Sequence, residues 1–362
     1  MIDFEPTEEQ QLIVETVRQF AANEIRPRAR ECDETWSLPA DALDRAHELG
    51  LVANALPAEF GGGGERSAVT GVLVAEELGW GDLSIALAIL SPGLAAFPVA
   101  DFGDAAQRKE LLPRYAGARF RPGALALTEP AFGSDVFRPA AAARRDGDGY
   151  VLSGAKCQVP WLDGDDLVWV SATDGERAQL FAVPRAAAGL KVERERNLGI
   201  QALPTAELRL EGVRVPAAAR LGGPAGVDLR ALVARGRVAL AALGVGVARA
   251  AYDLAREYAK ERHTFGAPIA TRQAIAFKLA DMAIEIDGAR LLVWEAAWRL
   301  DRGDDALREA TLAYEQVKRI ALEVADGAVQ VLGGHGYTRE YLPEMHLRNA
   351  RGFASFEALA LV

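Results

Sequence analysis

The sequence predicts a mainly helical α+β protein in which a small sheet separates two helical regions. Helical periodicity marks the first third, short alternating apolar runs mark the middle, and long helical stretches return in the last third. We therefore expect an N-terminal α-helical domain over residues 1–121, a middle antiparallel β-domain over 122–226 and a C-terminal antiparallel helical bundle over 227–362. With 362 residues, the chain is long enough to bury a large core.

Capping signals and apolar spacing locate the helices of the first region. The residues from Thr7 to Gln10 have the pattern of a capping box, which predicts the start of a helix. Arg26-Pro27 is expected to kink or end this helix, because proline interrupts helical hydrogen bonding. Further helices are expected over 39–50, 67–78, 83–90 and 107–115.

Turn residues divide the middle region into short strands. Asp146-Gly147-Asp148-Gly149 is typical of a hairpin turn. Apolar and charged residues alternate around it, which is typical of half-buried strands. We expect strands at 150–152, 167–170, 180–183, 190–192, 208–210 and 213–215, and then long helices over 229–262, 272–300 and 305–332.

Composition and charge exclude several classes of function. The formal net charge of -10 argues against nucleic acid or an anionic membrane as the main partner. The longest strongly apolar run, 238–248, is too short to span a bilayer. Cys32 and Cys157 form no CxxC motif, the four histidines lack metal-ligand spacing, and the N-terminus has no secretory pattern. We expect a cytoplasmic protein without a metal site.

An apolar run that ends in a turn, over 124–136, is the first candidate site. Leu127 and Thr128 precede Pro130, and Gly133 and Ser134 follow it. Such a turn presents free N–H groups and hydroxyls that suit a ligand with carbonyls and phosphates. An ordinary exit from a strand explains the same residues about equally well.

Two glycine-containing helix ends are further candidates. Arg262, Phe265 and the later Gln273 combine a cation, an aromatic ring and an amide near one turn, which could bind a nucleotide diphosphate. A surface arginine, a packed phenylalanine and a solvated glutamine are the alternative. Gln330 precedes Gly333 and Gly334, where backbone could approach a ligand closely, or where a helix simply ends in a glycine cap.

Charged residues of the last third include a candidate base. Arg237, near the start of a long helix, could serve a ligand or a carboxylate, or could be solvated. Glu357 follows Phe356 close to the last residue given; it is either a base that removes an acidic proton in a water-poor pocket or an exposed glutamate.

Taken together, these motifs resemble the acyl-CoA dehydrogenase family over nearly the whole chain. The resemblance implies FAD as cofactor, an acyl-CoA or acyl-carrier-protein thioester as substrate and electron-transfer flavoprotein as acceptor. It also implies a homodimer, homotetramer or heterotetramer in which two motifs reach a neighbour's FAD. By position, Glu357 resembles the catalytic base, and Ser134, Arg237 and Phe356 resemble substrate contacts. The implied cofactor residues are Leu127, Thr128, Gly133, Ser134, Gln158, Pro160, Arg262, Phe265, Gln273, Gln330, Gly333 and Gly334.

The chain departs from the family in two places. Gln158 and Pro160 occupy the positions of the tryptophan and the threonine of the family's Trp-Ile-Thr, and Pro160 has neither a hydroxyl nor an N–H donor. After Glu357, Ala358-Leu359 replaces Gly-Thr, and the sequence stops at Val362 before the helix with which the family continues. Without that helix we expect a poorly ordered Glu357.

Two functions follow from these observations. The first is α,β-desaturation of an acyl thioester to the trans-2-enoyl thioester. The alternative is a catalytically weak subunit of a heteromeric dehydrogenase, which would complete a neighbour's FAD site through Arg262, Phe265, Gln273 and Gln330.

Overall fold

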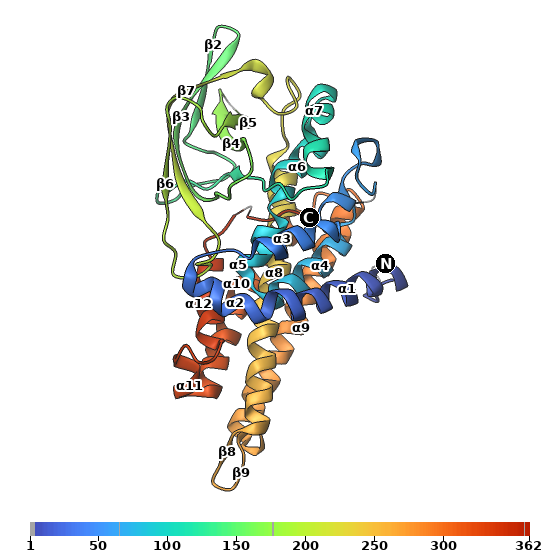
Figure 1. Ribbon diagram of the computed structural model, residues 1–362, viewed down its shortest axis with the longest axis vertical. Helices are drawn as coiled ribbons and strands as arrows, with labels where there is room; N and C mark the ends of the chain where they lie inside the picture. Colours follow the sequence, from blue (N-terminus) through green and yellow to red (C-terminus); the bar gives the residue numbers. More distant parts are fainter. Residues whose placement is uncertain (1–3, 65, 176, 358) are drawn as a thin grey trace.

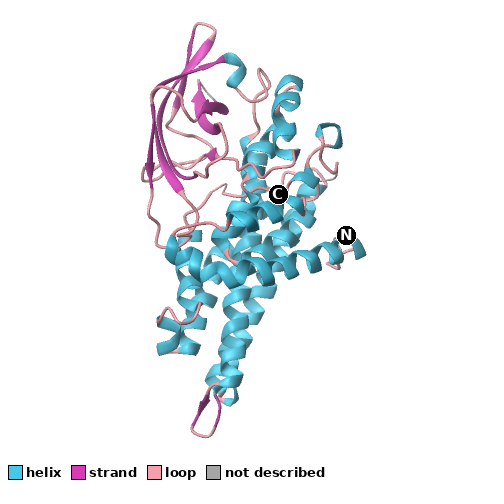
Figure 2. Cartoon of the chain, in the orientation of Figure 1, coloured by secondary structure: helices cyan, strands magenta, loops and turns pink. Residues whose placement is uncertain are grey.

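The computed structural model describes residues 4–64, 66–175, 177–357 and 359–362. Helices form both ends of the chain, and a single large sheet forms the middle. Figure 1 shows the sheet at one end of an elongated molecule and the long helices running to the other end. Colouring by secondary structure separates the two layers clearly (Figure 2). The predicted fold class is confirmed.

The first region contains seven α-helices among the described residues. The predicted capping box is present at Thr7, and the interruption expected at Arg26-Pro27 is a π-helical turn followed by a 3₁₀ turn. The structure adds a helix that begins at Pro92, where proline is tolerated because the first turn of a helix needs no N–H donor there. The helices are α1 (Glu8–Phe20), α2 (Ala29–Thr35), α3 (Ala40–Glu48), α4 (Ala68–Gly81), α5 (Leu83–Leu90), α6 (Pro92–Phe102) and α7 (Ala105–Ala116).

The sheet has the strand order β1-β4-β2-β3-β7-β6, and β5 pairs with β4 outside this order. Most pairs are antiparallel as predicted, but β1 and β2 pair with β4 in parallel. The two runs predicted at 208–210 and 213–215 form one strand, β7. The strands are β1 (Leu125–Ala126), β2 (Ala142–Asp146), β3 (Gly149–Pro160), β4 (Leu167–Asp174), β5 (Arg177–Pro184), β6 (Leu190–Arg194) and β7 (Thr205–Pro216).

Three long helices form the bundle. They are α8 (Leu229–Glu261), α9 (Gln273–Asp301) and α10 (Leu307–Leu332), followed by α11 (Gly334–Tyr337) and α12 (Pro343–Phe353). A short hairpin of β8 (His263–Thr264) and β9 (Ala267–Pro268) joins α8 to α9. Helix α4 packs closely on α8 at Gly246. A Cβ at this position would lie only 2.3 Å from the Glu76 carbonyl oxygen, so the approach requires glycine.

Two stretches, Leu83–Phe102 and Leu229–Glu261, are long and apolar enough to cross a membrane. The expectation that no apolar stretch has this length is therefore wrong. Within the fold, 94% and 83% of their apolar windows are buried, as in the core helices of a globular protein. Their hydropathy is accounted for by packing between helices.

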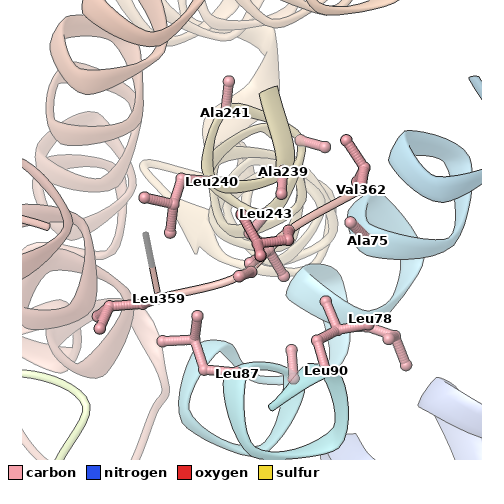
Figure 3. Close-up of a cluster of buried hydrophobic side chains, with 14 of the residues drawn as sticks. Ala75, Leu78, Leu87, Leu90, Ala239, Leu240, Ala241, Leu243, Leu359 and Val362 are labelled. Carbon is pink, nitrogen blue, oxygen red and sulfur yellow. The ribbon is translucent and has the colours of Figure 1, made fainter. Parts of the chain in front are cut away.

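The last described residues, 359–362, are buried. Figure 3 shows Leu359 and Val362 among side chains of α4, α5 and α8, including Leu87 and Leu243. The Val362 carbonyl oxygen accepts hydrogen bonds from Arg66 (2.6 Å) and Arg235 (3.0 Å). Apolar burial and arginine donors therefore hold residues 359–362, while the poor order expected of Glu357 itself stays a prediction.

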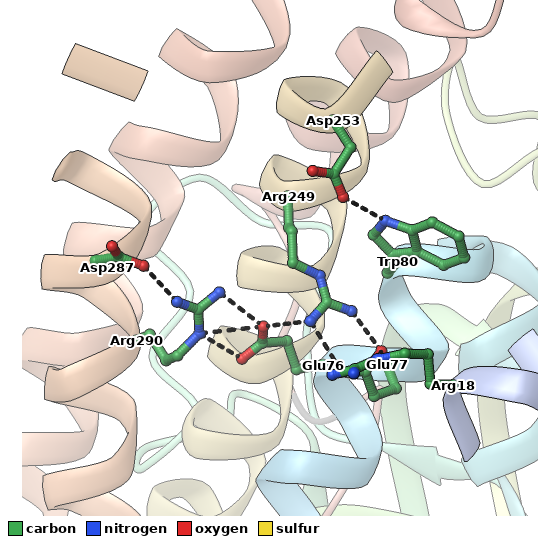
Figure 4. A network of polar contacts seen from close by, with 8 residues as sticks. All are labelled: Arg18, Glu76, Glu77, Trp80, Arg249, Asp253, Asp287 and Arg290. Carbon is green, nitrogen blue, oxygen red and sulfur yellow. Dashed lines mark hydrogen bonds and ion pairs between the residues drawn. The ribbon is translucent and has the colours of Figure 1, made fainter. Parts of the chain in front are cut away.

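A buried ion network joins α1, α4, α8 and α9 (Figure 4). Arg249 contacts Glu76 at 3.0 Å and Glu77 at 2.6 Å, Arg290 contacts Glu76 at 2.9 Å, and Arg18 contacts Glu77 at 2.9 Å. Burial alone would raise the pKa of Glu77, but hydrogen bonds from Arg249 and Arg18 hold it below its ordinary value. The network therefore stabilises the helical core as long as Glu77 is ionised.

The substitution Glu77→Gln should destabilise the fold. It removes charge-assisted bonds from two arginines, and we expect a loss of about 2–3 kcal/mol in the free energy of unfolding at neutral pH. Because the pKa of Glu77 is depressed, its contribution is present above the unfolded pKa and is lost as the pH falls through the folded one. Urea titrations across the acid range should therefore show a shallower pH dependence in the variant.

The exposed Glu257, which pairs with Lys260 on the same helix, offers a matched control. Glu257→Gln should leave the urea midpoint unchanged. An equal loss in both variants would show that burial of the network is unimportant.

Candidate functional site

A buried ion pair lies beneath the first candidate segment, residues 124–136. The Lys156 side chain of β3 is fully buried, and its Nζ contacts Glu129 Oε1 at 2.9 Å, Ser171 Oγ at 2.8 Å and the Leu127 carbonyl at 3.2 Å. A buried ammonium is tolerated only when it is paired and hydrogen-bonded. Lys156 thus fixes the chain that leaves β1 against β3 and β4.

Glu129 also closes the loop that follows β1. Its two carboxylate oxygens accept the backbone N–H groups of Ala140 and Ala141 at 2.8 and 2.9 Å. Burial opposes ionisation of Glu129, yet its bonds to Lys156 and to these amides hold its pKa below the ordinary value. Residues 130–135 between these anchor points are exposed, including Gly133 at φ 73° and Ser134.

This loop reaches the bundle through Phe137. The guanidinium carbon of Arg237 lies 5.9 Å from the centre of the Phe137 ring. Thr128, which is half-buried, lies at the start of the loop, and its carbonyl accepts the N–H of Cys157 at 3.0 Å. The structure therefore brings the residues after β1 close to the start of α8, where Arg237 is located.

Arg237 forms an ion pair with Glu357. Its Nη2 lies 2.7 Å from Glu357 Oε1, its Nε lies 3.2 Å from the same oxygen, and its Nη1 donates to Thr311 Oγ1 on α10 at 2.7 Å. The side chains of Arg237 and Glu357 are 16% and 20% exposed. Of the three alternatives left open for Arg237, which are a ligand, a carboxylate and solvent, the structure favours contact with a carboxylate.

Tyr314 of α10 fixes the backbone beside this carboxylate. Its hydroxyl donates to the carbonyls of Phe353 (3.2 Å) and Phe356, so that Phe356 is buried next to Glu357. Burial, with the nearby Glu357 charge, raises the pKa of Tyr314 and keeps its hydroxyl a donor. Glu357 is therefore held from both its side chain and its backbone.

Gln158 lies in a bulge of β3 and extends towards the same segment. The register shifts between Lys156 and Val159, and Gln158 has a φ of 56°. Its Nε2 donates to Ser355 Oγ at 2.9 Å, while its backbone N–H donates to the Glu195 carboxylate at 3.0 Å. Its Oε1 is buried and has no hydrogen-bond partner among the described residues.

Pro160 and Trp161 have other surroundings. Pro160 is buried at the end of β3, opposite Thr205. Trp161 lines a cavity of about 570 Å³ together with Trp36 and Phe120, and the Arg185 guanidinium lies 3.8 Å from its ring centre. The indole of Trp161 therefore packs between the sheet and the N-terminal helices.

The remaining predicted cofactor residues lie far from this cluster in the same chain. Arg262, Phe265 and Gln273 are exposed around the β8–β9 hairpin, which Figure 1 shows at the opposite end of the molecule from the sheet. Gln330, Gly333 and Gly334 are exposed at the end of α10, and beyond the adjacent backbone no described atom lies within 4 Å of a Cβ built on either glycine. Phe265 is 98% exposed, so the packed-phenylalanine alternative is wrong.

The sequence interpretation assigned no role to several residues that build the site. Lys156 and Glu129 position the loop, Thr311 and Tyr314 position Arg237 and Glu357, and Ser355 receives Gln158. A lysine inside a strand, with a glutamate in the loop after β1 as a possible counter-charge, was a usable signal for the first pair. Thr311, Tyr314 and Ser355 carry no such signal, because only the packing of α10 and α12 brings them to the site.

Comparisons with known proteins agree on one family. Family profiles match residues 7–119 (acyl-CoA dehydrogenase, N-terminal domain), 124–213 (middle domain) and 227–357 (C-terminal domain). The probable acyl-CoA dehydrogenase YngJ of Bacillus subtilis is 38% identical, over 97% of this chain and 94% of that protein.

Two solved structures are similar over nearly the whole fold. A chain described under "Electron transferring flavoprotein of Acidaminococcus fermentans" superposes with a TM-score of 0.90 at 31% identity, over 98% of this chain and 95% of that one. A glutaryl-CoA dehydrogenase of Mycobacterium smegmatis in complex with FADH2 superposes with a TM-score of 0.89 at 28% identity, over 97% and 91%.

The buried pair beneath the loop should be essential for stability. Lys156→Met would leave the Glu129 carboxylate buried without its cation, and we expect the free energy of unfolding to fall by about 3–5 kcal/mol. Adding Glu129→Gln should restore part of the loss, because the residual charge disappears. Urea denaturation measures both effects.

Lys191, which pairs with Glu211 on exposed strands, is the matched control. Lys191→Met should unfold like the wild type. A double variant as unstable as the sum of its two single changes would contradict the importance of the pair.

Proposed function

The chain belongs to the acyl-CoA dehydrogenase family, the FAD-dependent oxidoreductases that desaturate acyl thioesters, and we propose that Glu357 is the base of this reaction. The observation that carries the proposal is the ion pair between Glu357 and Arg237, which faces the loop after β1 through Phe137. A carboxylate held this firmly is already in place when a substrate arrives, which lowers the entropic cost of proton transfer.

The two oxygens of Glu357 differ in their contacts. Oε1 receives two bonds from Arg237, at 2.7 and 3.2 Å, whereas Oε2 lies 3.4 Å from Nε. We assign proton removal to Oε2, which keeps a lone pair free while Oε1 stays anchored. Glu357 would take the α-proton of the thioester, and the thioester would lose its β-hydrogen as hydride to the flavin, which leaves the trans-2-enoyl thioester.

The residues present fit FAD, with part of the site in one chain and part in another. Thr128, Ser134 and Gln158 would hold it from the sheet side, where Gln158 Oε1 offers a buried acceptor to a ligand. When bound, FAD supplies the acceptor for the hydride. Pro160 cannot donate a hydrogen bond, so Thr128 and Gln158 carry more of the polar contact in this chain.

We assign the distant motifs to a neighbouring copy. Arg262, Phe265, Gln273, Gln330, Gly333 and Gly334 are exposed and cannot serve the site of their own chain. Helix α9 supports association, because Phe277, Ile284 and Leu291 recur every seven residues and are 61%, 68% and 45% exposed. A homodimer or homotetramer would cover these side chains and complete each FAD site.

The substrate and acceptor follow the family. An acyl-CoA is the substrate class, and an electron-transferring flavoprotein is the kind of acceptor, consistent with the likeness to the Acidaminococcus chain. Cys32 and Cys157 are free thiols, which supports a reducing compartment such as the cytoplasm. The catalytically weak subunit is not favoured, because Glu357 and Arg237 are both in position.

The variant Glu357→Gln should abolish most of the proton transfer. The amide can still accept from Arg237 but cannot act as a base, and we expect flavin bleaching by an acyl-CoA to slow by about 10²- to 10⁴-fold. Stopped-flow absorbance of the FAD-loaded protein measures the rate. Glu323→Gln, an exposed change on α10, serves as the control. Equal rates for wild type and Glu357→Gln would remove Glu357 from the mechanism.

A mixed dimer tests the shared site. One subunit carries Arg262→Ala and the other Glu357→Gln, and two affinity tags isolate the mixed species. If Arg262 serves the neighbour, the Arg262→Ala subunit keeps its own base and receives an intact Arg262, so about half of the flavin should bleach rapidly. If Arg262 served its own chain, both sites would be defective and rapid bleaching would be absent.

A further inference from the structure

The bulge at Gln158 joins two parts of the molecule that otherwise belong to different layers. Its side chain extends from β3 of the sheet to Ser355, which lies after α12 and two residues before Glu357. Two features mark the bulge as built for this contact. Gln158 has a φ of 56°, unusual for a residue with a side chain, and the register of β3 against β7 shifts at the same point.

The strained backbone has its own support. The Gln158 N–H, which the bulge removes from the strand ladder, donates to both oxygens of Glu195 at 3.0 and 3.1 Å. A charge-assisted bond of this kind offsets part of the cost of a left-handed conformation. The surrounding structure therefore holds the side chain in one direction.

The orientation of the amide follows from the partners of Ser355. The Ser355 hydroxyl donates to the Gly352 carbonyl at 2.9 Å, so that it can only accept from Gln158. The Gln158 nitrogen must therefore face Ser355, and the oxygen must face away from it. That oxygen is buried and lacks a partner among the described residues. A buried acceptor without a donor is costly, which indicates that a ligand supplies one.

We propose that Gln158 is a positioning residue that links the bound ligand to the catalytic segment: its amide oxygen accepts from an N–H or O–H group of the ligand, and its amide nitrogen holds Ser355 and, through it, Glu357. The inference rests on the proposed function. The donor belongs either to FAD or to the amides of the thioester's CoA arm, which share this chemistry. Ligand binding would thereby fix the segment that carries the base.

Two substitutions remove the side chain in different ways. Gln158→Met keeps its length without polar atoms, and Gln158→Gly relieves the positive φ, so that loss of folding cannot explain a shared effect. Both substitutions should raise the dissociation constant of the ligand that supplies the donor by about five- to tenfold, which is the effect of losing one hydrogen bond. Fluorescence titration of the apoprotein with FAD, and of the FAD-loaded protein with an enoyl-CoA, identifies which ligand it is. Gln201→Met, outside the site, is the control.

Ser355→Ala separates the two ends of the amide. The substitution leaves Gln158 Oε1 intact, so the dissociation constants of FAD and enoyl-CoA should stay within about twofold of the wild-type values. Flavin reduction by acyl-CoA should slow by about tenfold, because the segment that carries Glu357 loses its hydrogen bond to the sheet. Combining it with Gln158→Met should slow reduction no further than the slower single variant, since both changes break the same bond.

The outcomes distinguish the inference from the function beneath it. If wild type binds FAD and enoyl-CoA, and neither Gln158 variant alters either dissociation constant, the proposed ligand contact is overturned. An unchanged reduction rate in Ser355→Ala would overturn the positioning role. A wild-type protein that binds no FAD would overturn the proposed function, and the inference would fall with it.

Discussion

The ion pair between Lys156 and Glu129 determines how the sheet meets the rest of the molecule. A fully buried ammonium requires a carboxylate partner and further acceptors. The Lys156 ammonium donates to the Glu129 carboxylate, the Ser171 hydroxyl and the Leu127 carbonyl, so that each of its three N–H groups has an acceptor. Because Glu129 also binds the amides of Ala140 and Ala141, the same charge that satisfies the lysine closes the loop after β1. The spacing between this loop and the bulge in β3 is thus set by electrostatics in the interior of the sheet.

Two contacts, referred to as bridges, then connect the sheet to the helical bundle. The Phe137 ring, from the loop, has its centre 5.9 Å from the Arg237 guanidinium carbon, and Gln158, from the bulge, donates to Ser355. Both bridges converge on Glu357, which Arg237 holds by its side chain and Tyr314 by the preceding backbone. The carboxylate is therefore positioned by three elements that are distant in sequence, while the buried residues 359–362 fix the chain beyond it. The ion pairs of Glu76 and Glu77 with Arg249 and Arg290 link α4, α8 and α9 in the same bundle.

The sequence was most informative where a local rule determines structure. The capping box at Thr7, the three long helices and the order of helical, sheet and helical regions follow from periodicity and turn residues. The parallel pairing of β1 with β4 could not be predicted, because it depends on which strands the tertiary fold brings together. The contacts of the Glu357 segment were also beyond the sequence. Its supports, Thr311, Tyr314 and Arg66, lie on helices whose packing no local pattern reveals.

The exposed motifs illustrate a further limit of any single-chain interpretation. Phe265 lies in the turn of the β8–β9 hairpin with a φ of 52° and is 98% exposed, and Gly333 caps α10 with a φ of 59° beside open space. The hairpin turn and the helix cap account for these two backbone conformations, but the Phe265 ring stays exposed. An exposed ring close to further exposed apolar side chains is typical of an interaction surface. The apolar stripe of Phe277, Ile284 and Leu291 on α9 lies on the helix that begins at this hairpin. A second copy packed on that stripe would cover these side chains, in the arrangement proposed above for completing each cofactor site. The exposed ring and the exposed stripe would then have one common physical explanation, which is association with a second subunit.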